Sequence, residues 1–416
     1  MRILLITQHF PPERGAVRRL FEFARHFRVK GHDVTVLTAI PNYPDGIIPE
    51  KYKGKFFCRE FMDGVEILRS YVLPASNAQP KKRMIGFLSF FLSTLINSLR
   101  LRGKYDIVLA SSPPVSSALL GWALSKLRRG KLVLEIRDLQ PEMGEQYGSL
   151  NKSFMTEMIR KMMRFVYKRA WKIVCVTEGL TNWMRENGFG NGQLSTIKSG
   201  VGDSFINSHS NGIRTKYGWE DKFLVLFCGT MGCVRSLEPV IESARMMADE
   251  KHFHFVFVGD GQKMSDYKNM ATRYNLDNVS FTGLQPLEEI PYFLKAGDVL
   301  VDCLKDVPFA KSVLPVKMFE YMAAGKPIIF GSPAKEATRL LDEAGGALTF
   351  SNNKPDELAD LIRQIYNRKI DGDNLGRRYH QYVRSNHSAD IWAQKYLDII
   401  ESNGNGNGNG NGNGSH

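Results

Sequence analysis

A short segment near Pro315 combines features that could bind a phosphate and a diol. Pro315 suits the first turn of a helix, Gly325 suits its end, and an apolar run typical of a buried strand follows. A helix that begins after a strand and a polar loop offers unpaired N–H groups and a positive dipole end to a phosphate. Glu320, one to two turns into this helix, could reach a neighbouring diol. Phosphate and diol together indicate a nucleotide sugar, although a plain crossover helix with one surface glutamate is the simpler interpretation of these residues alone.

Three other patterns look like binding motifs but are incomplete. Gly259 and Gly261 follow an apolar run, but a bare GxG lacks the full spacing of a dinucleotide-binding loop. The Gly-Lys-Pro at 325–327 is not a P-loop, because Ser or Thr is missing after the lysine. Asp371 and Asp373 could be mistaken for a metal-binding pair, but no strand precedes them, and we interpret them as a turn. The sequence therefore predicts chemistry that needs no metal ion and no bound cofactor.

Apolar runs typical of strands alternate with helical patterns along most of the chain. The first series of strands is expected at Arg2–Thr7, Asp33–Thr38, Val65–Ser70, Ile107–Ser111, Leu132–Ile136 and Ile173–Thr177. Its helices are expected at Gly15–Lys30, Met84–Leu101, Val115–Leu127 and Phe154–Arg169. The second series has strands at Phe223–Cys228, Phe253–Val258, Val279–Thr282, Val299–Cys303 and Pro327–Phe330, with helices at Ser236–Glu250, Lys263–Tyr274 and Ile290–Ala296. Alternation of this kind predicts parallel sheets that helices cover on both faces.

Two such series predict an α/β fold with two doubly wound, Rossmann-like domains that face a central cleft. We expect an N-terminal domain at 1–200, a hinge near 199–222 and a C-terminal domain at 201–384. A last helix within 385–402, with Ile391–Glu401 as its candidate, is expected to pack back on the first domain. The Asn-Gly repeat in the tail at 403–416 has nothing to bury and is expected to be disordered.

The net charge of +13 is unevenly distributed, because all of the basic excess belongs to residues 1–200. Such a half suits an acidic partner, either an anionic membrane or a nucleic acid, or it is a basic surface without a partner. Met84–Leu99 is an apolar run with basic flanks, too short for an ordinary membrane span and suited either to the lipid headgroup boundary or to the core. Phe154–Lys172 predicts an amphipathic basic helix, which could lie on a membrane or pack on its own domain. No nucleic-acid-binding signature occurs, so we expect no nucleic acid partner.

The cysteines indicate a reducing compartment. Five are present, an odd number without a CxxC pair, and the N-terminus has no pattern of a signal peptide. We therefore expect a cytoplasmic protein that is peripheral on the inner face of the cell membrane.

Many segments in the expected order resemble the retaining family-4 glycosyltransferases of the two-domain GT-B architecture. The donor-site signature of that family is similar to "LPVKMFEYMAAGKPII", and the opening "MRILLITQHFPPERGA" resembles the branch that assembles O-antigens and capsules, including fucosamine-type transferases. Further matching segments are "PNYPDG", "SPPVSSALLG", "LVLEIRDLQPE", "IVCVTEGL", "VFVGDGQ", "NVSFTGLQP" and "IPYFLKAGDVLV". The resemblance runs from Met1 to about Ser402. It implies that the C-terminal domain binds the nucleotide and the N-terminal domain binds the acceptor.

The resemblance implies a donor site built from several loops. Gly15 and Ala16 match a small-residue pair whose backbone approaches the donor diphosphate, with Ala16 in place of the usual second glycine. Gly229 opens the corresponding loop of the second domain, where relatives place an Arg and a Lys at the positions of Thr230 and Arg235. Arg235 can still neutralise phosphate, and Lys317 is a candidate substitute for the missing cation. Gly259 and Gly261 match the loop beside the base.

The same resemblance assigns the sugar side of the site. The donor motif has two glutamates eight residues apart. Glu320 matches the second, which binds the ribose hydroxyls in relatives, and Ser312 stands at the first. Backbone amides of Val313 and Leu314 could replace the missing carboxylate, or Ser312 could be a helix cap.

A strand end in the first domain supplies the candidate catalytic residues. Arg137 lies where many relatives have a histidine close to the reacting carbon. Asp138 is our candidate for orienting or deprotonating the acceptor hydroxyl, with Glu142 as second choice. The alternative is that these residues form a structural, salt-bridged turn.

The expected reaction is transfer of a sugar, such as an N-acetylamino sugar, from a UDP-linked donor to a lipid-linked saccharide. The resemblance implies retention of anomeric configuration by front-face attack, in cell-envelope polysaccharide assembly of a bacterium. Two alternatives remain open, namely a nucleotide-sugar epimerase of the same architecture and a membrane-associated protein that binds nucleotide sugars without catalysis.

Overall fold

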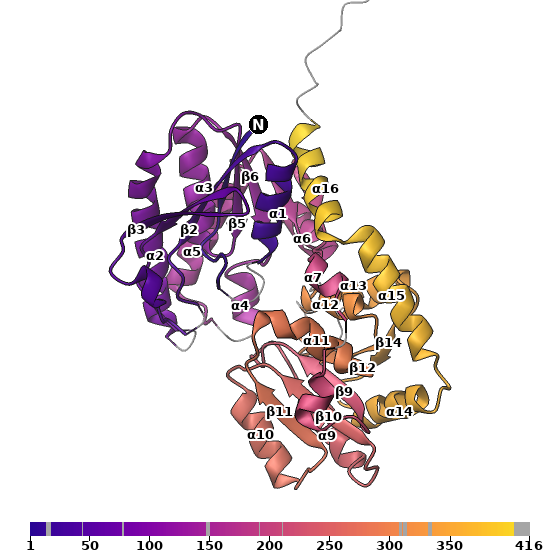
Figure 1. The fold of residues 1–416 in the computed structure, drawn as a ribbon. Coiled ribbons are helices and arrows are strands. Elements are labelled where there is room, and N and C mark those ends of the chain that lie inside the picture. Colours follow the sequence, from indigo (N-terminus) through magenta and orange to yellow (C-terminus); the bar gives the residue numbers. More distant parts are fainter. Residues whose placement is uncertain are drawn as a thin grey trace, which may run out of the picture.

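The computed structural model has two α/β domains, each built on one mainly parallel sheet (Figure 1). It describes residues 1–402 except 14–17, 44, 77–78, 147–149, 191, 210, 308–309, 311–313 and 332–334. The predicted tail at 403–416 lies outside the described residues.

The first sheet has eight strands in the order β3-β4-β2-β1-β5-β6-β7-β8, and only β3 runs antiparallel to its neighbour. The central strands are almost continuous runs of buried Val, Ile and Leu, as a sheet covered on both faces requires. The strands are β1 (Arg2–Ile6), β2 (Asp33–Ala39), β3 (Phe57–Met62), β4 (Val65–Ser70), β5 (Ile107–Ser112), β6 (Lys131–Ile136), β7 (Lys172–Cys175) and β8 (Leu194–Thr196).

Helices cover both faces of the first sheet. They are α1 (Arg18–Val29), α2 (Pro80–Asn97), α3 (Val115–Leu127), α4 (Glu142–Gln146), α5 (Phe154–Tyr167) and α6 (Glu178–Glu186). Side chains of successive strand residues point to opposite faces, so Leu4 packs with α2, α3 and α5, while Leu5 packs with α1. Within the described residues, no helix is long and apolar enough to cross a membrane.

The second sheet has six strands in the order β11-β10-β9-β12-β13-β14, and every pairing in it is parallel. Its strands are β9 (Phe223–Cys228), β10 (Phe253–Val258), β11 (Val279–Gly283), β12 (Val299–Cys303), β13 (Ile328–Gly331) and β14 (Leu348–Phe350). Its helices are α7 (Asp203–Ile206), α8 (Ile213–Tyr217), α9 (Glu238–Met246), α10 (Met264–Arg273), α11 (Ile290–Ala296), α12 (Lys317–Ala324), α13 (Lys335–Glu343), α14 (Pro355–Tyr366) and α15 (Gly372–Asn386). Helices α9, α10 and α14 cover one face of this sheet, and α11, α12, α13 and α15 cover the other.

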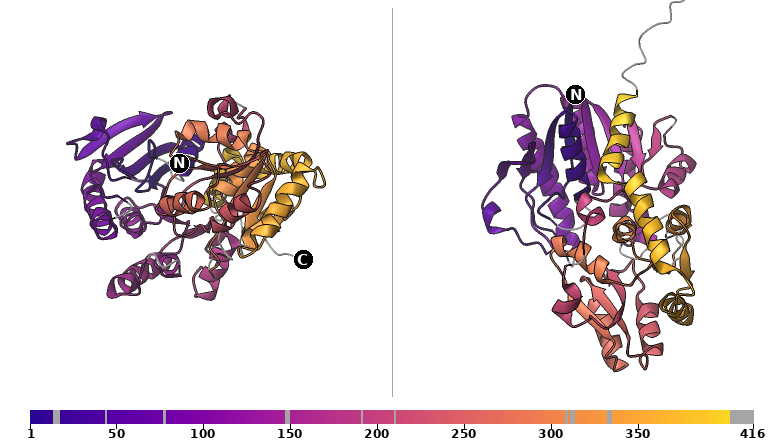
Figure 2. Two further views of the ribbon diagram at one scale, coloured as in Figure 1. Left: turned by 90° about the horizontal axis from the view of Figure 1, so that it is seen from below. Right: turned by 45° about the vertical axis from the view of Figure 1, so that its right-hand side comes forward.

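The last helix, α16 (Ala389–Glu401), returns to the first domain and packs against α1. Figure 2 shows α15 and α16 following one another along one side of the molecule from the second domain to the first. A buried network fixes the contact, because Arg19 Nη2 donates to Tyr396 Oη at 2.9 Å and Tyr396 Oη donates to Glu135 Oε1 at 2.6 Å. Helix α15 ends at Asn386 and packs with α12 in the second domain, whereas α16 begins at Ala389 and packs on the first domain.

Most predicted elements agree with the structure to within a few residues, and the differences have local causes. The strand predicted to reach Thr177 ends at Cys175, because the Thr177 side chain caps α6 by accepting the Leu180 N–H at 3.1 Å. Three strands were not predicted, β3, β8 and β14, and each is short or at an edge with side chains of mixed polarity. The turn expected at Asp371 and Asp373 is instead the start of α15, where Asp371 caps the helix by accepting the Asn374 N–H at 2.9 Å and Asp373 lies in the first turn.

Candidate active site

The carboxyl ends of β9, β10 and β12 bring the donor-side candidates of the second domain together. Gly229 follows β9 with φ +147°, and a Cβ there would lie 3.0 Å from Lys317 Nζ. Gly259 has φ +126°, and its Cβ would come within 2.1 Å of the Gly229 carbonyl oxygen. Gly261 approaches the Met231 backbone as closely, with a Cβ 2.5 Å from its carbonyl oxygen. These glycines are therefore required for the loops after β9 and β10 to pack against each other and against Lys317 of α12 at one edge of the sheet.

A buried carboxylate holds two cations beside these loops. Asp302, on β12, is fully buried and accepts Lys317 Nζ at 3.0 Å and Arg235 Nη1 at 2.9 Å. Lys317 Nζ also lies 3.8 Å from the centroid of the Phe227 ring and donates to the Cys228 carbonyl at 3.3 Å. Burial, with Arg235 nearby, lowers the pKa of Lys317 to about 8. Two cations on one carboxylate leave an excess positive charge at the sheet edge, which suits a diphosphate.

Glu320 lies one turn beyond Lys317 on α12. Burial raises the pKa of its carboxyl to about 7, and Lys317 opposes that shift. Glu320 has no hydrogen-bond partner among the residues that the structure describes, whereas the neighbouring Tyr321 hydroxyl is paired with the Cys228 backbone at 2.7 and 3.0 Å. A half-buried carboxylate without a partner can accept hydrogen bonds from a ligand.

Several expected donor residues contribute less or cannot be assessed. Thr230 is exposed beside Gly229 and supplies no charge. Leu314 is buried in the core of the second domain, so only its backbone could serve a ligand. The remaining candidates lie outside the described residues: Gly15, Ala16, Ser312 and Val313.

The first-domain candidates Arg137 and Asp138 follow β6. The Arg137 N–H donates to the Ser112 carbonyl at 2.9 Å, and its Nη2 donates to the Pro113 carbonyl at 2.6 Å. Surrounding protein raises the pKa of the Asp138 carboxyl to about 6, and the Arg137 charge opposes the shift. Asp138 is exposed, so water and a ligand can both reach its carboxyl.

Glu142 lies in a structural ion-pair network rather than standing free. Its Oε1 accepts Arg160 Nε at 3.0 Å, and the same guanidinium reaches Glu145 at 3.0 Å and Glu157 on α5. These contacts join α4 to α5, as the salt-bridged alternative expects for Glu142. Asp138 has no such partner among the described residues.

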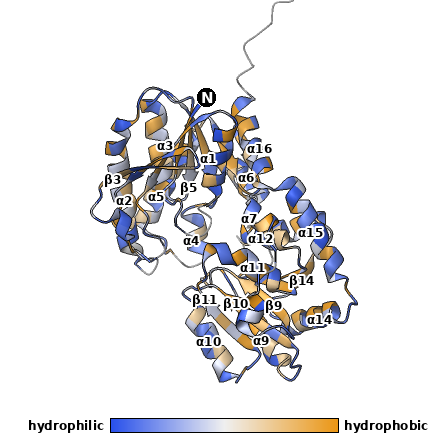
Figure 3. Cartoon of the chain, viewed as in Figure 1, coloured by the Kyte–Doolittle hydropathy of each residue, from blue (hydrophilic) through white to orange (hydrophobic). Residues whose placement is uncertain are grey.

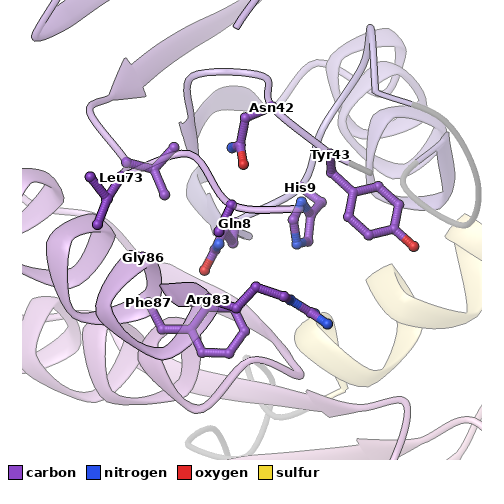
Figure 4. A pocket seen from close by; sticks show the side chains of 10 residues that line it. Gln8, His9, Asn42, Tyr43, Leu73, Arg83, Gly86 and Phe87 are labelled. Carbon is purple, nitrogen blue, oxygen red and sulfur yellow. The ribbon is translucent and has the colours of Figure 1, made fainter. Parts of the chain in front are cut away.

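The structure also brings together residues that were not singled out from the sequence. A pocket in the first domain is lined by side chains that include Gln8, His9, Tyr43, Arg83 and Phe87 (Figure 4). The pocket contains none of the donor-side residues. Figure 4 shows His9 and Tyr43 from the loops after β1 and β2, with Arg83 of α2 approaching from another side.

One buried carboxylate organises the rim of this pocket. Glu13 Oε2 lies 2.8 Å from His9 Nδ1, and its Oε1 accepts the N–H groups of Asn42 and Tyr43 at 2.8 and 2.9 Å. The sequence signal for this pocket was the presence of polar residues directly after two parallel strands. The corresponding signal for Asp302 was a single acidic residue inside the apolar run of β12.

Comparison with known proteins agrees with this arrangement. The description "Glycosyltransferase Family 4" matches residues 14–205, and "Glycosyl transferases group 1" matches residues 210–385. The two domains are those of a family-4-type GT-B glycosyltransferase. The two models divide the chain between the two sheets, so the transferase assignment does not depend on either domain alone.

Relatives of this glycosyltransferase have low sequence identity to it, but the similarity covers most of the chain. A probable glycosyltransferase, WbjE of Pseudomonas aeruginosa, is 27% identical over 74% of this chain and 77% of its own. The putative colanic acid biosynthesis glycosyl transferase WcaI of Escherichia coli is 25% identical over 92% of this chain and 100% of its own. The solved structure of Anabaena HepE in complex with UDP and glucose has a TM-score of 0.70 at 16% identity, covering 97% of this chain and 100% of that chain. At that identity the structure supports the fold alone.

Proposed function

We propose that this glycosyltransferase moves a sugar from a UDP-linked donor to a hydroxyl of a lipid-linked saccharide, with retention of configuration and without a metal ion or cofactor. The observation that carries the proposal is the pairing of Lys317 and Arg235 on Asp302, beside Glu320, at the carboxyl edge of the second sheet. A cation pair suits the diphosphate, and a carboxylate with no partner in the described part of the chain suits the ribose diol. The UDP complex of HepE and the colanic acid name of WcaI support the donor and the pathway class.

The proposed chemistry uses charge stabilisation more than a nucleophile. As the bond between the sugar and the diphosphate breaks, negative charge develops on the leaving phosphate, and Lys317 and Arg235 stabilise it. The acceptor hydroxyl attacks from the same face, and its proton passes to the departing phosphate. Asp138 orients that hydroxyl, and Gly229, Gly259 and Gly261 allow the donor to approach the backbone. Outside the described residues, Gly15, Ala16, Ser312 and Val313 are proposed to complete the donor site.

The first domain is proposed to bind the acceptor, and the protein is proposed to be peripheral on the cytoplasmic face of the membrane. Membership of the O-antigen and capsule branch, with an N-acetylamino sugar as donor, is part of this proposal and rests on the sequence resemblance. Arg137 is proposed to contribute charge near the reacting carbon.

The experiment is a calorimetric screen of UDP, GDP and their sugar conjugates, followed by sugar transfer to a bacterial lipid extract. We expect a UDP-sugar to bind and its sugar to enter the lipid fraction with an unchanged anomeric configuration. Asp138→Asn should leave the donor affinity within twofold and lower transfer at least a hundredfold. Binding of a UDP-sugar without any transfer would instead support a non-catalytic protein, and absence of nucleotide-sugar binding would refute the donor assignment.

A further inference from the structure

The outer side of α2 is exposed although it is apolar. Five large apolar side chains on α2 and the turn after it are at least half exposed: Ile85, Leu88, Leu92, Ile96 and Leu99. Their spacing of three or four residues places them along one side of the helix. We call these five residues the α2 stripe. Figure 3, coloured by hydropathy, shows α2 at the edge of the first domain that lies away from α16.

The inner side of α2 is rich in small and polar residues that contact the protein. Gly86 packs on the Leu73 carbonyl oxygen, which a Cβ would approach to 2.9 Å. Ser89 Oγ accepts the Leu73 N–H at 2.8 Å, and Ser93 Oγ donates to the Tyr71 carbonyl at 2.5 Å. A surface helix of a globular domain normally turns its polar side to water. Phe90 enters the core and Phe91 and Leu95 pack against it, but every exposed side chain of α2 after Lys82 is apolar. That is the reverse of the usual arrangement and indicates that the stripe meets an apolar medium.

Charge around the stripe identifies that medium. The chain has no Asp or Glu between Glu66 and Asp106, so no acid of this segment offsets its lysines and arginines. Lys82 stands at the start of α2, and Arg100 and Arg102 stand beyond its end, all of them exposed. An apolar stripe with basic groups at both ends is complementary to an anionic bilayer, whose headgroups attract the cations while the stripe enters the acyl boundary.

We propose that the α2 stripe docks this protein on an anionic lipid bilayer. This inference deepens the proposed function, on which it rests only for the lipid-linked nature of the acceptor. Arg83 and Phe87, in the first turns of α2, also line the pocket that holds His9. Docking through the stripe therefore brings that pocket to the headgroups, where the polar part of a lipid-linked acceptor lies.

A second copy as the occupant of the stripe, and α5 as the docking helix, both fit the structure less well. In a twofold contact between two α2 helices, antiparallel packing would set Lys82 of one copy against the Arg100 and Arg102 of the other, and like charges repel. Helix α5, the other basic amphipathic helix, has only Phe154 and Met155 as exposed large apolar residues.

The experiment measures co-sedimentation of the full chain with vesicles of phosphatidylcholine alone or mixed with phosphatidylglycerol. We expect binding to the anionic vesicles and at least tenfold weaker partitioning of Leu88→Glu/Leu92→Glu. The matched control is Leu284→Glu, which places the same charge on an equally exposed leucine of the second domain and should bind within twofold of wild type. Binding of the double variant at the wild-type level, or no binding of the wild type, would overturn the proposal.

A second variant covers the case in which the first does not fold. Arg100→Gln/Arg102→Gln keeps the stripe and removes two cations, each worth about fivefold in anionic binding, so it should weaken binding more than tenfold. Sedimentation velocity adds a third outcome. A dimer that Leu88→Glu/Leu92→Glu dissociates, without vesicle binding, would assign the stripe to a second copy and refute the bilayer.

These outcomes are separable from the donor proposal. Affinity for UDP is measured without vesicles, and its loss in the wild type would refute the donor site while leaving the docking result unchanged. Conversely, Leu88→Glu/Leu92→Glu should retain its UDP affinity within twofold, because α2 lies in the first domain and contributes no donor-side residue.

Discussion

Lys317 and Glu320 lie one helical turn apart with opposite charges. Burial lowers the pKa of Lys317 to about 8 and raises the pKa of Glu320 to about 7. Burial in a site normally disfavours both charged forms, so the fold maintains this pair against a desolvation cost. Such a cost is typical of groups that a ligand later neutralises. At the scale of the residue, the two shifts give predictions about binding and about stability.

The first prediction concerns the pH dependence of donor binding. Lys317 is protonated below a pKa of about 8, and Glu320 is ionised above about 7. The diphosphate requires the ammonium form and the diol favours the carboxylate, so UDP affinity should peak between these values and fall on both sides. Isothermal calorimetry from pH 5.5 to 9.5 measures it. Lys317→Met should weaken UDP binding at least tenfold and remove the alkaline decline, and an alkaline decline that persists in this variant would exclude Lys317 as its source.

The second prediction is that Glu320→Gln stabilises the protein while weakening donor binding. The folded-state pKa of about 7 lies above the unfolded value of about 4.3. The contribution of this carboxyl to stability is therefore full below the unfolded pKa and is lost as the pH rises through 7. At pH 8 the amide avoids a buried charge, and we expect about 1–2 kcal/mol of added stability in urea unfolding. At pH 4 the variant and the wild type should unfold alike, and a gain of equal size at both pH values would contradict the mechanism.

At the scale of the element, α16 is the clearest case of distant segments held by one network. Arg19 on α1, Glu135 on β6 and Tyr396 on α16 are all buried, and every strong bond among them is charge-assisted. A buried carboxylate of this kind is stable only with partners. Burial alone would raise the pKa of Glu135, but the charge of Arg19 opposes this effect and holds the pKa below its ordinary value. The position of α16 therefore depends on a few polar atoms as well as on apolar contact.

The third prediction tests that dependence. Tyr396→Phe removes one donor to Glu135 and one acceptor from Arg19 without changing the ring volume. We expect a loss of about 2–3 kcal/mol of unfolding free energy, because bonds to charged groups exceed neutral ones. Tyr366→Phe is the matched control, since the Tyr366 hydroxyl has no hydrogen bond within the described part of the chain, and it should change stability by less than about 0.5 kcal/mol. Equal changes in unfolding free energy for the two variants would show that the network does not contribute to stability.

The elements also show how far sequence reasoning reaches. Strands β9, β10 and β12 were predicted to the residue, because short, mainly apolar runs bounded by polar loops leave one interpretation. Asp302 was missed for the same reason, since an acid inside such a run has no recognisable function until Lys317 and Arg235 are folded against it. The exposure of the α2 stripe could not be predicted either, because the sequence of Met84–Leu99 is equally suited to a core. Which side of a helix faces its domain depends on neighbours outside the helix, here Tyr71 and Leu73.

At the scale of the whole molecule, the two domains touch near the start of α6 and α13. Glu336, at the start of α13, accepts the Gly179 N–H at 3.1 Å, and Lys198 lies 3.5 Å from Glu343. A carboxylate at the N-terminus of α6 satisfies an unpaired backbone donor and interacts favourably with the helix dipole. The contact therefore joins the domain proposed for the acceptor to the domain proposed for the donor.

The fourth prediction is that Glu336→Ala loosens this contact without unfolding either domain. Hydrogen exchange of the α6 amides, measured by mass spectrometry, should accelerate at least threefold in the peptide that contains Gly179. Exchange in the β9 and β10 peptides should stay unchanged, because those strands lie in the core of the second domain. Glu336→Gln, which keeps an acceptor but removes the charge, should fall between wild type and alanine. Because Glu336 also pairs with Arg339 at 3.1 Å, Arg339→Ala is the necessary control. If Arg339→Ala accelerates the same amides as strongly, the effect belongs to the order of α13 and not to the bond between the domains.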